Sequence, residues 1–299
     1  MDVKLSKRMF SLLSTSDGLW QQRKRKINTA SIFASLCAAS LNKRGLRHIV
    51  DADNSDFTPQ ALGKSRMKLP DNLFHDINRA IQKPYQEGPR IYAVDGSKVH
   101  VHPSFVKQGF KSRTNDKPVS RPAKRPLAML SSMLDVKTRT CYDALVTEHF
   151  NERKSALSHM TQAKAGDTIL FDRGYYSSQL LQKACDMGLK VVFRLKRNAF
   201  RGAKRFFNSD ITTARTIIIA ADGSLLRARL VKYFIDGKCY MCLTNSEASS
   251  SEVKCLYAMR WRVETSFRRL KSDLNLETSH SMTTKAFVQE VQAESFMTQ

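Results

Sequence analysis

Two aspartates in this sequence, Asp95 and Asp172, stand in the same kind of position. Each follows a short apolar run, IYAV before Asp95 and TILF before Asp172, and a glycine comes soon after each. Sheet proteins place catalytic groups where strands open onto loops. A partly buried carboxylate needs compensation, and a divalent cation is one strong source of it. For either aspartate alone, capping of the next turn is an equally good interpretation.

A third carboxylate, Glu264, lies in a segment with helical periodicity from about Ser251 to Leu276. One narrow stripe of this helix, within about 60° around its axis, carries four polar residues: Tyr257, Arg260, Glu264 and Lys271. Beside it runs an apolar stripe, which predicts the buried face: Leu256, Met259, Val263, Phe267, Leu270 and Leu274. Such a helix can hold Glu264 beside the two aspartates. Solvated ion pairs at i, i+4 spacing also explain Arg260 and Glu264, but they do not explain Tyr257 in the same line.

Carboxylates without another well-placed ligand favour a hard cation, Mg²⁺ or Mn²⁺. Two such ions can activate the attacking oxygen and stabilise the leaving oxygen of a phosphoryl displacement. His100 and His102 alternate along the chain and are interpreted as half-exposed strand residues. Cys239 and Cys242 have no second cysteine pair, and residues three apart on a strand face opposite ways, so core cysteines are favoured over a zinc site.

The charge of the chain points to an anionic partner. Lys and Arg number 50 against 27 Asp and Glu, which gives a net charge of +23. Nucleic acid is the usual partner of so basic a protein, with a ribosomal or merely solubilised basic protein as the alternative. No apolar run reaches the roughly 20 residues of a membrane span, and no cleavable signal is visible at the start. We therefore expect no membrane association and a location in the cytoplasm.

Residues 1–88 have helical and basic character. Helices are predicted over Ile27–Leu41, after the Thr58-Pro59 pair, and over Pro70–Ile81. We interpret this part as a DNA-end-binding helical domain, with a plain helical lid as the alternative. The prolines and glycine within residues 82–90 predict a linker.

Residues 89–299 carry a different pattern. Strands and helices are predicted in the order of three strands followed by alternating helix and strand: strands at 90–94, 127–136, 140–147, 167–171 and 190–195, with helices at 151–165 and 177–187. This order predicts an α/β fold with a mixed sheet and helices packed on it. Residues 196–250 break the alternation and predict a β insertion of antiparallel strands.

Several of these motifs resemble one known family. The spacing Tyr257-x2-Arg260-x3-Glu264-x6-Lys271 resembles the Tyr-Arg-Glu-Lys signature of the insertion sequence 4 family of DDE transposases. VDGS at 94–97 and DRGYYS at 172–177 resemble the blocks around that family's first and second aspartates. TPQALGKSRMKLP at 58–70 resembles its N-terminal region.

The resemblance implies an RNase H-like catalytic core with a β insertion between the second aspartate and the glutamate. It implies that Asp95, Asp172 and Glu264 ligate two Mg²⁺ ions, for which Mn²⁺ can substitute. It further implies DNA contacts near the cleaved phosphate by Tyr257, Arg260 and Lys271, where Arg260 can also steady Glu264. Arg173 is expected to be an additional DNA contact, by its position only.

The implied function is that of a DNA transposase that cuts element ends, frees a 3′-OH and transfers it to another phosphodiester. A hairpin intermediate is typical of the resembled family. The implied partners are double-stranded DNA, as terminal inverted repeats and as target, and a second copy of the chain in an active dimer, in the bacterial nucleoid. Two alternatives stay open: a DNA-binding remnant that is inactive because the chain ends soon after Lys271, and an RNase H-like nuclease that cleaves without strand transfer.

Overall fold

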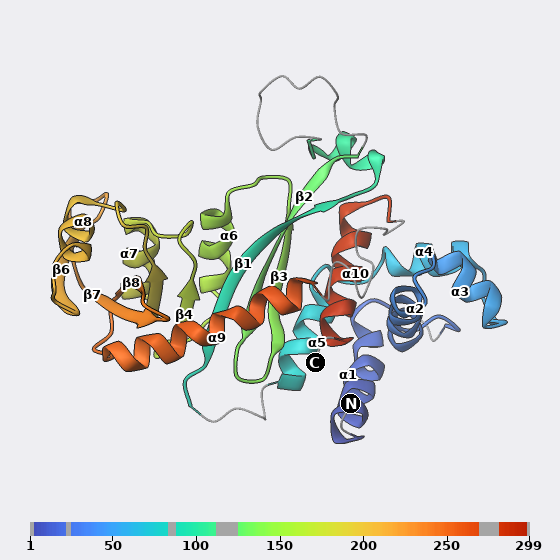
Figure 1. The fold of residues 1–299 in the computed structure, drawn as a ribbon. Helices are drawn as coiled ribbons and strands as arrows, with labels where there is room; N and C mark the ends of the chain where they lie inside the picture. Colours follow the sequence, from blue (N-terminus) through green and yellow to red (C-terminus); the bar gives the residue numbers. More distant parts are fainter. Residues whose placement is uncertain (1–2, 22–24, 83–87, 112–124, 269–280, 298–299) are drawn as a thin grey trace.

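A computed structural model describes residues 3–21, 25–82, 88–111, 125–268 and 281–297 (Figure 1). Its centre is an eight-stranded sheet in the order β3-β2-β1-β4-β5-β8-β7-β6. The strands have these bounds: β1 Ile91–His100, β2 Leu127–Asp135, β3 Thr140–Thr147, β4 Thr168–Phe171, β5 Lys190–Arg194, β6 Thr213–Ile219, β7 Leu225–Ile235 and β8 Lys238–Thr244.

The first five strands form a mixed sheet. β1, β2 and β3 pair antiparallel, whereas β4 and β5 continue the sheet parallel to β1. With helices on both sides, this arrangement confirms the predicted α/β fold with an RNase H-like core. β6, β7 and β8 are the predicted antiparallel strands of the insertion. They extend the same sheet, because β8 pairs with β5 at Val192↔Thr244.

Side chains along each central strand alternate between the two faces of the sheet. On β1, Tyr92 and Val94 pack with α6 (Glu152–Met160) and α7 (Ser178–Asp186). Ala93 points the other way, to the face covered by α9 (Ser250–Arg268) and α10 (Thr284–Met297). Figure 1 shows α9 running across the sheet, from β7 and β8 to β1. The sheet therefore has two separate apolar cores, one under each layer of helices.

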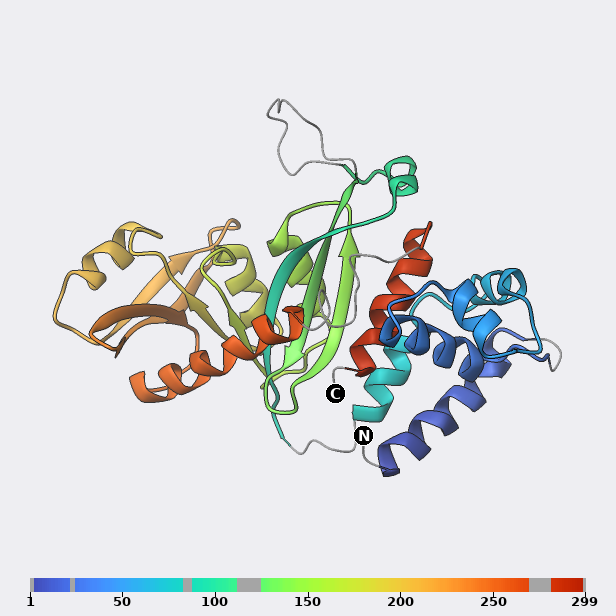
Figure 2. The same cartoon turned by 45° about the vertical axis from the view of Figure 1, so that its right-hand side comes forward.

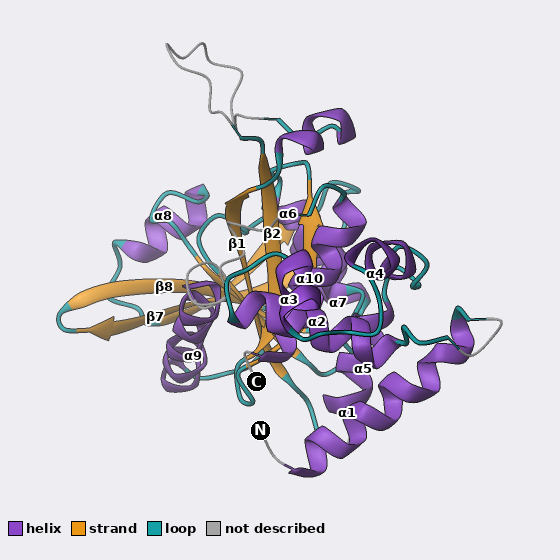
Figure 3. Ribbon diagram, turned by 90° about the vertical axis from the view of Figure 1, so that its right-hand side faces the viewer, coloured by secondary structure: helices purple, strands orange, loops and turns teal. Residues whose placement is uncertain are grey.

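The N-terminal helices gather at one side of the sheet (Figures 2 and 3). They are α1 Val3–Thr15, α2 Thr29–Leu41, α3 Leu46–Ala52, α4 Pro59–Arg66 and α5 Leu73–Gln82. Local signals define two of their starts, because Asn28 caps α2 through a reciprocal bond with Ser31 and Thr58 caps α4. Helix α10 joins this group, and its Ala293 is part of the apolar core that these helices form.

Most predicted elements are present with shifted ends, and three features differ. β1 continues past Asp95 to His100, while His102 caps the short 3-10 helix Pro103–Gln108. Helices α8 (Arg201–Phe207) and α10 lie where no helix was predicted. Within the described residues, no helix is long and apolar enough to cross a membrane.

Candidate active site

Asp95 and Asp172 lie side by side on neighbouring strands. Parallel pairing of β1 with β4 ends at Val94↔Phe171, and the next residue of each chain segment is an aspartate. Asp95 does not end its own strand, contrary to the sequence-based expectation, because β1 goes on pairing with β2 at Asp95↔Ser132. The strand that ends there is β4. The two side chains are 23% and 38% exposed, so both carboxyl groups are open to ligands.

Helix α9 brings two side chains of its polar stripe onto this pair of aspartates. The Tyr257 hydroxyl donates a hydrogen bond to Asp172 Oδ1 at 2.9 Å. Arg260 Nη1 lies 3.7 Å from Asp95 Oδ2. From β5, Arg194 Nη1 lies 3.7 Å from Asp172 Oδ1. Residues one turn apart on α9 therefore contact different aspartates.

The described part of α9 buries residues of its polar stripe as well as packing its apolar stripe against the core, where Leu256 and Met259 lie. Tyr257 and Arg260 are almost fully buried, whereas Leu256 and Met259 are only partly buried. A buried guanidinium is tolerable where a carboxylate compensates its charge, and Asp95 supplies that compensation. The buried part of α9 therefore combines apolar contacts of Val253 with polar contacts of Tyr257 and Arg260 to the aspartates.

The surroundings of Asp172 favour its charged form. Burial acts to raise its pKa, but the backbone N–H of Arg173 and the charge of Arg260 act in the opposite direction. The Tyr257 hydroxyl and the charge of Arg194 add to them, so the pKa of Asp172 lies below its usual range. Burial raises the pKa of Tyr257, which keeps its hydroxyl protonated as a donor. At neutral pH the site presents an ionised carboxylate.

One acidic neighbour of the aspartates, Glu152, was not singled out from the sequence. It is the first residue of α6. Burial raises its pKa, and the charges of Asp95 and Asp172 raise it further. The sequence signal that could have identified it is an acid at the start of the first helix after the three-strand meander.

The remaining residues expected in the site are only partly described. Glu264 lies in α9 one turn after Arg260, and its side chain is outside the described part. Lys271 lies outside the described residues, and Arg173 is exposed next to Asp172. Among the described side chains, no three His, Cys, Asp or Glu residues converge closely enough to hold a metal ion.

The residues present nevertheless fit a hard cation. Carboxylate oxygens are its preferred ligands, and Asp95 and Asp172 offer them side by side where β4 ends next to β1. A glycine follows each aspartate, Gly96 directly after Asp95 and Gly174 two residues after Asp172, and Glu152 lies close to both glycines. An added Cβ on Gly96 would lie 3.2 Å from Glu152 Oε1, and one on Gly174 would lie 3.4 Å from Glu152 Oε2.

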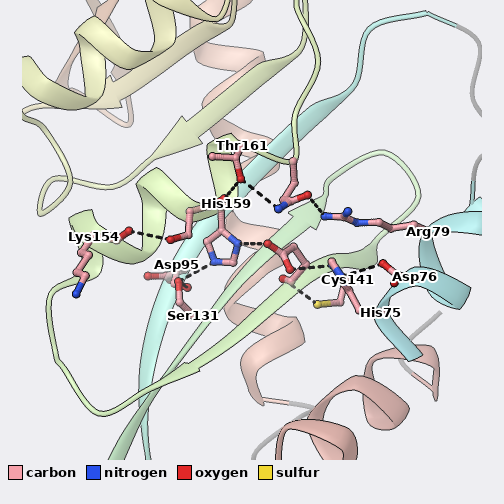
Figure 4. Close-up of polar contacts among 12 residues, drawn as sticks. His75, Asp76, Arg79, Asp95, Ser131, Cys141, Lys154, His159 and Thr161 are labelled. Atoms are coloured by element: carbon pink, nitrogen blue, oxygen red, sulfur yellow. Dashed lines mark hydrogen bonds and ion pairs between the residues drawn. The ribbon is translucent and has the colours of Figure 1, made fainter. Parts of the chain in front are cut away.

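A second polar cluster, the buried histidine network, lies behind Asp95 on the face covered by α6 (Figure 4). His159 Nδ1 lies 2.8 Å from Asp143 Oδ2, and His159 Nε2 lies 3.0 Å from Ser131 Oγ. The Ser131 hydroxyl is also 3.4 Å from the carbonyl oxygen of Asp95. On the other side, His75 Nε2 of α5 lies 2.9 Å from Asp143 Oδ1. The network thus connects an N-terminal helix to the strand that carries Asp95.

Comparisons with known proteins place the chain in a family. No curated protein sequence matches it. The cryo-EM structure of the piggyBac transposase synaptic complex with hairpin DNA is similar at a TM-score of 0.48 and 12% identity, covering 98% of this chain and 72% of that chain. The Mos1 transposase paired-end complex with the left transposon end gives a TM-score of 0.23 and 9% identity, covering 57% of this chain and 60% of that chain. The profile described as transposase DDE domain matches residues 86–297, so the chain belongs to the DDE transposase domain family.

Proposed function

We propose that this chain is a DNA transposase of the insertion sequence 4 type, which cleaves the ends of its element and joins them to target DNA in cut-and-paste transposition. The observation that carries the proposal is the position of Asp95 and Asp172 side by side, where β4 ends next to β1, with Tyr257 of the signature helix bonded to Asp172. Arg260 reaches Asp95 from the same helix, at the spacing of the signature. The family match over residues 86–297 supports the same reaction class.

In this proposal Asp95, Asp172 and Glu264 hold two Mg²⁺ ions, which Mn²⁺ can replace. When bound, the ions supply an activated attacking oxygen and a stabilised leaving oxygen. Asp95 and Asp172 are suited to this role because they are adjacent and partly open. Glu264 follows Arg260 by one turn of α9, so the helix that contacts Asp95 also carries the third proposed ligand.

The cationic residues around the aspartates would bind the DNA backbone. A guanidinium matches the geometry of phosphate oxygens, and it can exchange a carboxylate partner for a phosphate. Arg260 lies 3.7 Å from a carboxylate oxygen, longer than a tight charged hydrogen bond, and so does Arg194. We assign Tyr257, Arg260, Lys271 and the exposed Arg173 to contacts with DNA near the cleaved phosphate.

The wider DNA interface is proposed from charge. A net charge of +23 favours a polyanionic partner, and phosphate contacts by Lys and Arg provide most non-specific affinity. We assign end binding to the helical residues 1–88 and catalysis to residues 89–299. Because a mobile element has two ends, the active complex is proposed to contain two copies of the chain, one for each end.

A cleavage assay tests this function. The substrate is linear DNA that carries the terminal inverted repeats flanking the gene, incubated with the full chain and Mg²⁺. We expect nicking at the repeat boundary, followed by joining of the new 3′-OH to a target plasmid. Asp95→Asn, Asp172→Asn and Glu264→Gln should each lower the cleavage rate by about a thousandfold or more, because each removes a metal-binding charge.

The matched control is Asp186→Asn, which removes an exposed carboxylate at the end of α7 and should cleave like the parent protein. Cleavage without joining would identify an RNase H-like nuclease instead. Binding to the repeats without any cleavage by the parent protein would identify a DNA-binding remnant. Equal activity of the parent and the three acid variants would contradict the assignment of the site.

A further inference from the structure

Glu152 occupies the inward face of α6 rather than its solvent face. Two turns further along the same face lies His159, which is fully buried, and Ser155 and Ala156 between them are buried as well. An acid at a helix start is ordinarily explained by its attraction to the positive end of the helix dipole. Attraction to the helix dipole does not explain why the Glu152 side chain points into the protein. The start of α6 also has another cap, because Asn151 accepts a hydrogen bond from the Lys154 N–H.

The carboxyl group of Glu152 lies between the two segments that carry the aspartates. Its Oε1 lies against Gly96, directly after Asp95, and its Oε2 lies against Gly174, two residues after Asp172. An added Cβ at Gly96 would lie 3.2 Å from Oε1 and only 3.1 Å from Met129 Sδ. The two glycines of the VDGS and DRGY blocks therefore make the room that this carboxylate occupies.

The start of α6, which carries Glu152, is tied to the segment after β4. Arg153 Nε donates a 3.0 Å hydrogen bond to the carbonyl oxygen of Gly174, which ties the first turn of α6 to the segment after β4. This bond keeps Glu152 close to Asp95 and Asp172, which have the same sign of charge, and the charge of Lys98 offsets part of their repulsion. Such an arrangement costs free energy unless a cation neutralises it.

We propose that Glu152 is a further carboxylate of the active site, whose charge strengthens divalent-cation binding at Asp95 and Asp172. The inference rests on the proposed function, because it takes the cation site from it. Glu152 does not complete a ready-made chelate with the two aspartates. It approaches them from the α6 side of the sheet, whereas Glu264 belongs to α9, so the cation site would receive negative charge from both faces.

Mn²⁺ titration by calorimetry of the full chain, without DNA, tests this role. Glu152→Gln should bind Mn²⁺ about tenfold or more weakly than the parent, a loss typical of residues that support metal ligands. Glu152→Asp retains the charge and should recover most of the affinity. Glu148→Gln, an exposed acid before the same helix, is the matched control and should bind like the parent.

Thermal unfolding without metal separates a cation role from a helix-start role. Removal of a repelling charge should leave the melting temperature of Glu152→Gln equal to or above that of the parent, and should reduce the further rise that Mn²⁺ produces. A lowered melting temperature with unchanged Mn²⁺ affinity would assign Glu152 to the helix dipole and overturn the inference. Absence of Mn²⁺ binding by the parent would overturn the proposed function as well, whereas equal binding by the parent and Glu152→Gln would overturn the inference alone.

Discussion

The two polar clusters beside β1 are built in opposite ways. The buried histidine network is sealed: His159 is 0% exposed, and the two oxygens of Asp143 each face a histidine nitrogen within 2.9 Å. The acid site on the other face is open, and its arginines stand 3.7 Å from the carboxylates. Both clusters surround carboxylates with nitrogen groups of other side chains, but the carboxylate of the first is buried and those of the second are partly exposed. Greater exposure of its carboxylates distinguishes the proposed active site from the buried network.

The largest effect of a substitution is expected on protein stability, in the buried histidine network. Asp143→Asn should lower the free energy of unfolding by about 3 kcal/mol, because it removes a buried carboxylate whose two oxygens face His159 and His75. Burial acts to raise the pKa of Asp143, but hydrogen bonds from His159 and His75 hold it well below its usual range.

The sign of the pH dependence follows from that lowered pKa. The contribution of Asp143 is complete above the pKa of the unfolded chain, about 4, and is lost as the pH falls below it. Urea unfolding between pH 3 and pH 7 measures both effects. If Asp143→Asn were as stable as the parent protein at pH 7, the structural role assigned to the buried histidine network would be contradicted.

At the site of Asp95 and Asp172, substitutions are expected to change the rate of end cleavage. Arg260→Gln should slow end cleavage by about a hundredfold, because it removes a positive charge that would face the reacting phosphate. Its melting temperature should change less than that of Asp143→Asn. Arg215→Gln, on the exposed edge strand β6, is the control for general loss of DNA affinity. Equal losses of rate in the two variants would show that Arg260 acts only through overall charge.

A buried carboxylate in α10, Glu294, extends the comparison to an acid outside both clusters. Burial raises its pKa from 4.5 to about 9, although Ser40 donates a hydrogen bond to it. As the pH rises, Glu294 ionises at a lower pH in the unfolded chain than in the folded protein. The free energy of unfolding should therefore fall between about pH 5 and pH 9. Glu294→Gln should flatten this decline and stabilise the protein by about 2 kcal/mol at pH 8. Thermal melts across this range test it, and an unchanged slope would contradict the assignment.

The smallest effect on the cleavage rate is expected from the hydrogen bond that Tyr257 donates to Asp172. Tyr257→Phe removes the bond to Asp172 and should slow cleavage about fivefold, as for a single hydrogen bond of about 1 kcal/mol. Since the hydroxyl lowers the pKa of Asp172, the acid limb of the pH–rate profile should move to higher pH. Tyr240→Phe on β8 provides the control. An unchanged pH–rate profile would show that the Tyr257 hydroxyl does not influence the ionisation of Asp172.

Local signals in the sequence were sufficient for much of the fold. The cap at Thr58 and the apolar run before Asp172 each define an element that the structure contains. The adjacency of Asp95 and Asp172 follows from two strands of like pattern that pair in parallel. The catalytic roles assigned to them remain predictions.

Features that depend on contacts between distant parts of the chain could not be predicted from local sequence signals. The pairing of β8 with β5 joins residues 52 apart at Val192↔Thr244, which makes the insertion part of the main sheet. The near-complete burial of Arg260 on α9 was not predicted, because hydrophobicity alone ignores the compensation of its charge by Asp95. Glu152 and His159 belong to one helix face whose importance depends on what the sheet places opposite it.

The central claim is that a divalent cation binds where Asp95 and Asp172 meet. Fe²⁺ loaded into the full chain, with ascorbate and peroxide, generates hydroxyl radicals that cut the backbone nearest the bound ion. The account predicts cuts next to Asp95 and Asp172 that excess Mg²⁺ suppresses and that Asp172→Asn abolishes. Cuts elsewhere, or cuts at these positions that Mg²⁺ leaves unchanged, would contradict it.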